Sequence, residues 1–165
     1  MCKFLVVGDV TVDQMYFVET LPDQGGERTA LRAVMEPGGA GGTIATVLAR
    51  LSTPVTIATR VGLGPFSDLA LSNVRESGVE TQLIQNDKHL QTSSVTLLIT
   101  PDTQRTMISA SGASRNLDSA ELSYEIVAEY DALVMSAYSL VSGRQREYAV
   151  QSLGHARKAG LTTFV

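Results

Sequence analysis

The sequence has little of several residue types that define common classes of protein. Its 165 residues include one cysteine, Cys2, and two histidines, so an internal disulfide is excluded and a Cys/His zinc site lacks its ligands. Lysine and arginine total 13 against 17 aspartates and glutamates, a formal charge of −4, which leaves no basic stripe to follow a phosphate backbone. We therefore expect no nucleic-acid partner and no metal site, and the lone cysteine fits a reducing, cytoplasmic location.

Long apolar runs are also missing. The first run, Phe4 to Val7, is interrupted by Gly8 and Asp9, which makes it too short for a signal-peptide core or a membrane span. The chain nevertheless has 44% hydrophobic and 18% charged residues, a composition typical of a globular domain with a hydrophobic core. We predict one globular unit that carries no obvious export signal and does not enter a membrane.

Short patterns of buried strands alternate with patterns of amphipathic helices along the chain. This alternation is typical of a right-handed β-α-β parallel sheet, which binds its ligand at the carboxyl ends of the strands. The glycine run before residue 43 makes Thr43 the expected N-cap of the first helix. The strands are predicted at 3–9, 55–61, 81–85, 132–138 and 161–165, and the helices at 43–51, 67–77, 118–122 and 143–159.

The remaining β-rich segments lack helical crossovers. Residues 28–35 alternate between apolar and polar side chains, and residues 92–100 and 105–111 are joined by a turn that predicts a hairpin. We expect these segments to form a separate small sheet, a lid. Because the pattern stops inside the apolar strand at 161–165, the next strand and its covering helix are missing, and we expect the chain to be a fragment.

The first candidate site residue is Asp13, which follows the first predicted strand. A carboxylate at the end of a buried strand can accept charge-assisted hydrogen bonds from adjacent hydroxyl groups of a ligand. The alternative is an aspartate that accepts hydrogen bonds only from the amides of its own turn. The spacing alone leaves both possibilities open.

The second candidate is the run of glycines at 38, 39, 41 and 42. Such a run lets backbone amides approach a ligand just before a helix N-terminus, although a flexible hinge has the same composition. The lysine of a Walker loop and the third glycine of a dinucleotide fingerprint are both absent. Arg105 in the hairpin could reach a negatively charged substrate, and Tyr138 ends a predicted strand at the edge of the site. Their alternatives are an exposed strand arginine and aromatic packing.

Several short motifs occur in an order that is known from one protein family. They are Val6-Val-Gly-Asp-Val-Thr-Val-Asp13, Pro22-Asp-Gln-Gly-Gly-Glu27, Pro37-Gly-Gly-Ala-Gly-Gly-Thr-Ile-Ala45, Val61-Gly-Leu-Gly-Pro-Phe66, Arg105-Thr-Met107 and Ser111-Gly-Ala-Ser114. In this order they resemble the amino-terminal half of the PfkB/ribokinase family of carbohydrate kinases, and the resemblance covers essentially all 165 residues.

The resemblance implies a ribokinase-like three-layer α/β sandwich with a parallel core sheet and a small β lid. Residues 1–165 would be its N-terminal part, with lid segments at about 14–36 and 92–111, and the ATP-binding half and the catalytic aspartate would lie beyond residue 165. The reaction implied is transfer of the ATP γ-phosphoryl group, with Mg²⁺, to a hydroxyl of a small carbohydrate or nucleoside. Lid closure would exclude water as a competing acceptor.

The resemblance also assigns residues. Asp13 would hold sugar hydroxyls, backbone amides near the sugar would come from Gly38, Gly39 and Gly42, and Tyr138 would contact the substrate. The family signature usually has asparagine where Thr43 stands, so Thr43 would offer the sugar a hydroxyl in place of a carboxamide. An acidic residue is common in the family where this chain has Gly64.

Two functions therefore remain open for this chain. The first is the substrate-binding half of an ATP-dependent sugar kinase, inactive by itself. The second is a non-catalytic family member that binds a polyol or nucleoside, or that forms a homodimer through its lid. The sequence identifies neither the sugar nor the hydroxyl that would be phosphorylated.

Overall fold

A computed structural model describes residues 1–165 and contains a five-stranded parallel sheet in the order β5-β4-β1-β8-β9. The central strand β1 is fully buried at Leu5, Val6 and Val7, which explains its continuous apolar run. Strand β1 lies between β4 and β8 because later crossover connections add strands to both of its sides. The strands are β1 (Phe4–Val7), β4 (Val55–Val61), β5 (Ile84–Asn86), β8 (Ala132–Met135) and β9 (Thr162–Phe164).

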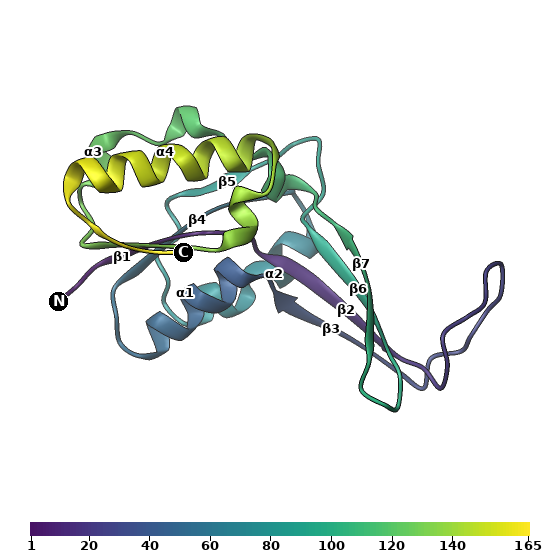
Figure 1. Ribbon diagram of the computed structural model, residues 1–165. Coiled ribbons are helices and arrows are strands. Elements are labelled where there is room, and N and C mark those ends of the chain that lie inside the picture. The colour runs from purple at the N-terminus through teal and green to yellow at the C-terminus, as the bar shows by residue number, and fades with distance from the viewer.

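Helices cover both faces of this sheet, as Figure 1 shows. Helices α1 (Ala40–Arg50) and α2 (Pro65–Glu76) lie on one face, and α3 (Tyr124–Val127) and α4 (Gly143–Ala159) lie on the other. Successive side chains of β1 point to opposite faces, so Leu5 and Val7 pack in the core with Tyr148 of α4, while Val6 packs in the core with Val74 of α2. The three layers predicted from the sequence are confirmed.

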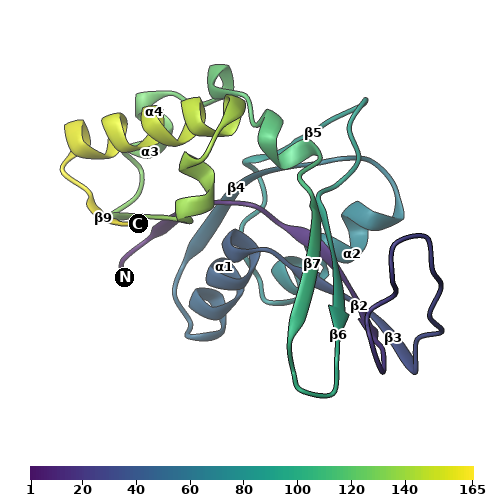
Figure 2. The ribbon, with the colours of Figure 1, turned by 45° about the vertical axis from the view of Figure 1, so that its right-hand side comes forward.

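A second, four-stranded sheet projects from the parallel sheet and is called the side sheet below (Figure 2). Its order is β3-β2-β6-β7, and it is mixed because β2 pairs with β6 in parallel while the other two pairs are antiparallel. The strands are β2 (Thr11–Phe17), β3 (Arg32–Gly38), β6 (Ser94–Ile99) and β7 (Arg105–Ala110). No helix of the chain combines the length and the apolarity that crossing a bilayer requires.

Some boundaries differ from the sequence-based prediction. The predicted strand at 3–9 ends at Val7, and after Gly8–Val10 the chain begins β2, a strand that was not predicted. Helix α1 begins at Ala40 with Gly39 as its N-cap, so the prediction of Thr43 as N-cap is wrong. The predicted strand at 132–138 ends at Met135, and a 3-10 turn follows at Ala137–Leu140.

A buried charge network ties the end of β4 to the segment that follows β5. The carboxylate of Asp87 is 2% exposed and accepts hydrogen bonds from Arg60 Nε at 3.0 Å and from Asn116 Nδ2 at 2.8 Å. The backbone amides of His89 and Leu90 also donate to it, each at 2.9 Å. These hydrogen bonds, with that of Asn116 the largest contribution, hold the pKa of Asp87 well below its ordinary value.

We expect Asp87→Asn to reduce the free energy of unfolding by about 3 kcal/mol at neutral pH, because it leaves the partly buried Arg60 guanidinium without its counter-charge. Since the pKa of Asp87 is lowered in the folded protein, its stabilisation is complete above the ordinary aspartate pKa of about 4 and is lost as the pH falls below that value.

Urea unfolding at neutral pH and at about pH 3 measures this difference. The difference in the free energy of unfolding between wild type and Asp87→Asn should be smaller at the lower pH. Glu76→Gln, on the exposed surface of α2, is the control. An equal gap at both pH values would contradict a charge-based role for Asp87.

Candidate functional site

The site is built where the turn between β1 and β2 meets the N-terminus of α1. A Cβ on Gly8 would lie 2.7 Å from Gly41 Cα, and a Cβ on Gly41 would lie 2.6 Å from the carbonyl carbon of Gly8. Gly39 has φ of +89°, and a Cβ there would lie 2.6 Å from the Asp9 carbonyl oxygen. The Asp9 carbonyl accepts a hydrogen bond from Gly42 N at 3.0 Å. The glycines are therefore required by direct backbone contact between the two segments.

Asp13 lies on β2, with its carboxylate held from two sides. The Thr11 hydroxyl donates a hydrogen bond to Asp13 Oδ1 at 2.7 Å, and Gly38 of the neighbouring strand β3 lies so close that any side chain there would collide with the carboxyl group. Thr11 and Asp13 are two residues apart on a strand, so they share one face. The arrangement orients the carboxylate while leaving it partly exposed.

Asp9 is a second carboxylate in this region. Its Oδ1 atom is buried and has no hydrogen-bond partner in the chain. Burial raises the pKa of Asp9, and the negative charge of Asp13 raises it further, while the backbone amides of Asp9, Gly41 and Ala40 partly offset the shift. A buried carboxyl oxygen without a donor is a group that a ligand hydroxyl or a water molecule can satisfy.

These residues line a cavity of about 540 Å³ between the side sheet and the ends of the parallel strands, called the large cavity below. Strand register explains its lining: Asp13 of β2 pairs with Val95 of β6, which pairs with Ser109 of β7, and all three point to the cavity. Four predicted site residues meet in this cavity, namely Asp13, Gly39, Arg105 and Tyr138.

Tyr138 comes to the cavity from the 3-10 turn after β8, not from a strand, and its side chain is 73% exposed. Further residues of the cavity were not predicted. Two of them, Asp9 and Thr11, belong to the motif that contains Asp13, and alternation along β2 would have marked Thr11. Ser93 and Ser114 form a buried hydroxyl pair at 2.7 Å, and although Ser114 ends a recognised motif, no local sequence pattern predicts its contact with Ser93.

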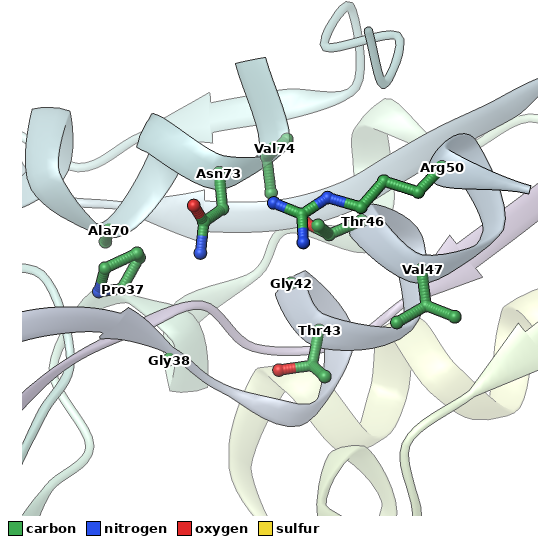
Figure 3. Close-up of a pocket in the computed structure, with 10 residues that line it drawn as sticks. All are labelled: Pro37, Gly38, Gly42, Thr43, Thr46, Val47, Arg50, Ala70, Asn73 and Val74. Carbon is green, nitrogen blue, oxygen red and sulfur yellow. The ribbon is translucent and has the colours of Figure 1, made fainter. Parts of the chain in front are cut away.

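Three other predicted residues line a different, smaller cavity, shown in Figure 3. Gly42 and Thr43 are part of α1, and because the helix begins at Ala40 they share one helical face with Thr46, Val47 and Arg50. None of the residues on that face lines the large cavity. Gly38 also lines this cavity and contacts Asp13 from behind. Gly42 and Thr43 therefore do not line the large cavity with Asp13, and their contact with a sugar stays a prediction.

The fold and the large cavity define a class: an α/β sandwich with a cavity between the end of its parallel sheet and a projecting β sheet. The chain belongs to the pfkB family of carbohydrate kinases, whose domain matches residues 1–165. This match confirms the resemblance seen in the motifs.

Solved structures show the same fold. Ribokinase from Arabidopsis thaliana, complexed with ribose and ATP, has 22% sequence identity and a TM-score of 0.86, covering 99% of this chain and 53% of that chain. Fructokinase from Halothermothrix orenii has 21% identity and a TM-score of 0.84, covering 98% of this chain and 55% of that one. Ribokinase from Cryptococcus neoformans in complex with ADP has 19% identity and a TM-score of 0.79, covering 99% and 50%. The chain spans about half the length of these proteins.

We expect Gly41→Ala to destabilise the protein by about 1–3 kcal/mol, because the added Cβ would force α1 away from the Gly8 backbone. Gly154→Ala is the matched control, since a Cβ there meets nothing within 4 Å and lies in the interior of α4. The control should be neutral or stabilising by up to about 1 kcal/mol. Chemical unfolding of both variants measures this, and equal stability of the two would show that the Gly8 contact is not tight.

Asp9→Asn should stabilise the protein at neutral pH by about 1 kcal/mol. The pKa of Asp9 is raised in the folded state, so the wild type loses stability as the pH rises above the ordinary aspartate pKa of about 4, and the neutral amide avoids this loss. The difference should vanish below about pH 4. Unfolding curves across pH test it, with the exposed Asp23→Asn as control. A variant less stable than wild type at neutral pH would show that the Asp9 charge is favourable.

Proposed function

We propose that the large cavity binds a small carbohydrate or nucleoside, and that the intact protein transfers the γ-phosphoryl group of ATP to one of its hydroxyl groups. The observation that carries the proposal is the oriented Asp13 carboxylate, which has Thr11 as a donor on one side and an open cavity of about 540 Å³ on the other. That volume falls in the usual range of small-molecule sites, about 300–1,000 Å³. Membership of the pfkB family of carbohydrate kinases supports the same class of ligand.

The proposed contacts follow from the position of each residue at the cavity. Asp13 accepts hydrogen bonds from two adjacent sugar hydroxyls, and these bonds are strong because the acceptor is charged. Because Gly39 has no side chain, its backbone can approach the bound sugar closely. Arg105 and Tyr138 lie at the cavity from the side sheet and from the turn after β8, where they border the bound sugar. The similarity to the ribokinase from Arabidopsis thaliana, complexed with ribose and ATP, supports a sugar as the ligand.

The side sheet is proposed to act as a lid. Its cavity face carries apolar side chains, Leu97 and Met107, beside the polar ones. A sheet that closes over the sugar with such side chains excludes water, which otherwise competes as the phosphoryl acceptor. This is the part of the mechanism that residues 1–165 supply: they bind the acceptor, orient its hydroxyl and limit solvent access.

The same residues do not fit ATP or Mg²⁺. No three acidic, histidine or cysteine side chains of the chain gather as a cation site, and no Gly-Lys-Ser/Thr loop is present for a triphosphate. The proposal therefore assigns the nucleotide, the metal ion and the catalytic aspartate to residues outside 1–165. When bound, ATP supplies the phosphoryl group, and catalysis is mostly positioning and charge stabilisation.

A second candidate is a family member that binds a polyol or nucleoside without phosphorylating it, or that pairs with a second copy. Met35 and Ile108 are 50% and 66% exposed, and they lie in one cross-strand row through Gln14 and Thr96. This row is on the face of the side sheet opposite Asp13, because odd and even residues of a strand alternate. The exposed apolar side chains at the two ends of this row favour contact with another sheet.

Asp13→Asn tests the proposed function in the full-length protein that contains residues 1–165. The change keeps the size and the Thr11 contact but removes the charged acceptor, so we expect phosphorylation of the best sugar substrate to fall by about 10²–10³-fold. Asp23→Asn, an exposed loop carboxylate, is the control.

Calorimetry with a panel of small sugars, each also assayed for ATP-dependent phosphorylation, separates the two candidates. Binding that Asp13→Asn weakens, together with ATP-dependent turnover in the wild type, supports the kinase. Binding without turnover favours the second candidate, and full activity in Asp13→Asn would remove Asp13 as the acceptor of sugar hydroxyls.

A further inference from the structure

The smaller cavity, of about 140 Å³, lies between α1, α2 and the end of β3. Figure 3 shows it bordered by the face of α1 that carries Thr43, Thr46 and Arg50, and by Asn73 of α2 across from that face. Only the glycine segment at 38–42 is shared with the large cavity, through Gly38 and Gly42 on this side and Gly39 on the other. Its chemistry can therefore be considered independently of the proposed function.

Charge at this cavity comes from one group. Arg50 is the only ionisable residue among the ten that line it. The guanidinium forms no ion pair, and it donates no hydrogen bond within the chain, whereas Arg60 and Arg75 of neighbouring elements have carboxylate partners at 3.0 and 3.1 Å. An unpaired guanidinium beside a hollow is a binding group for an oxyanion, which it can hold with two parallel hydrogen bonds.

A buried hydroxyl points to the same ligand. Thr46 is 6% exposed, and its Oγ1 atom is buried without a hydrogen-bond partner. Thr46 lines the same cavity as Arg50 and Asn73, and Figure 3 shows the three side chains around it. Buried polar atoms are normally satisfied, so an orphan hydroxyl at a cavity indicates a partner that the protein itself does not supply.

The size of the cavity limits the partner. Sites for sugars, nucleotides and other drug-sized ligands measure about 300–1,000 Å³, well above this cavity. The available donors are a guanidinium, a carboxamide and two threonine hydroxyls, and no carboxylate lines the cavity. Such a set matches a compact, negatively charged group whose oxygens accept hydrogen bonds in several directions.

From these contacts we propose that the α1–α2 cavity is a binding site for a small oxyanion of the phosphate or sulfate class. Arg50 supplies the charge and Thr46 and Asn73 supply hydrogen bonds. The anion can be a free ion or the terminal group of a larger molecule that extends out of the cavity, since the recognised chemistry is the same.

The test uses the full-length protein carrying residues 1–165, with inorganic phosphate, sulfate and a phosphomonoester in calorimetry, and sodium chloride at matched ionic strength as the salt control. We expect phosphate and sulfate to bind with a dissociation constant of about 1 mM or lower. Arg50→Gln and Thr46→Val should each weaken binding by about tenfold or more, because each removes a hydrogen bond to a charged group. Arg146→Gln, an exposed arginine of α4, should leave the affinity unchanged.

The variants also separate the possible outcomes. Tighter binding of the phosphomonoester than of phosphate would identify the terminal group of a larger molecule as the source, and equal binding would identify the free ion. No binding of any of the three anions, or equal binding in wild type and Arg50→Gln, would overturn the site. Because Arg50 is at the exposed end of α1, its variant should remain folded, which thermal unfolding verifies.

Discussion

The contact between the backbones of Gly8 and Gly41 is the constraint on which the rest of the site depends. A Cβ on either residue would come within 2.7 Å of the other segment, so the β1–β2 turn and the start of α1 can meet only as glycines. This contact brings the amides at the N-terminus of α1 next to the Asp9 carboxyl. The chain leaves the parallel sheet at this turn and enters β2, which carries Asp13 in the side sheet.

The same turn places Asp9 and Asp13 in surroundings that differ in burial. Asp9 is pushed towards its neutral form by burial, while Asp13, on the next strand, stays partly exposed and oriented by Thr11. Two carboxyl groups in different surroundings thus face one cavity, and one of them has an oxygen that no protein donor satisfies. Such a site is costly to the folded protein and useful to a ligand rich in hydroxyl groups. The chain belongs to the pfkB family of carbohydrate kinases, which supports the proposal of a sugar as that ligand.

The sequence predicted those features that depend on local pattern. The apolar run of β1, the helix periodicity of α2 and α4, and the hairpin of β6 and β7 are all confirmed, because burial and turn chemistry act over a few residues. Strand β2 was not predicted because it follows β1 after only Gly8–Val10, and the motif around Asp13 was interpreted as the end of the first strand. Thr43 lies on the face of α1 that lines the smaller cavity, and α1 has its N-cap at Gly39, four residues before the predicted one. The Ser93–Ser114 pair depends on tertiary packing alone.

The most direct test of the central claim is an NMR titration of the ¹⁵N-labelled full-length protein with D-ribose and D-fructose, followed at the backbone amides. If the large cavity holds the sugar, shift changes will concentrate at Thr11–Asp13 and at Gly39–Ala40, and Asp13→Asn will abolish them. Changes confined to other parts of the molecule, or changes that persist in Asp13→Asn, would contradict the account.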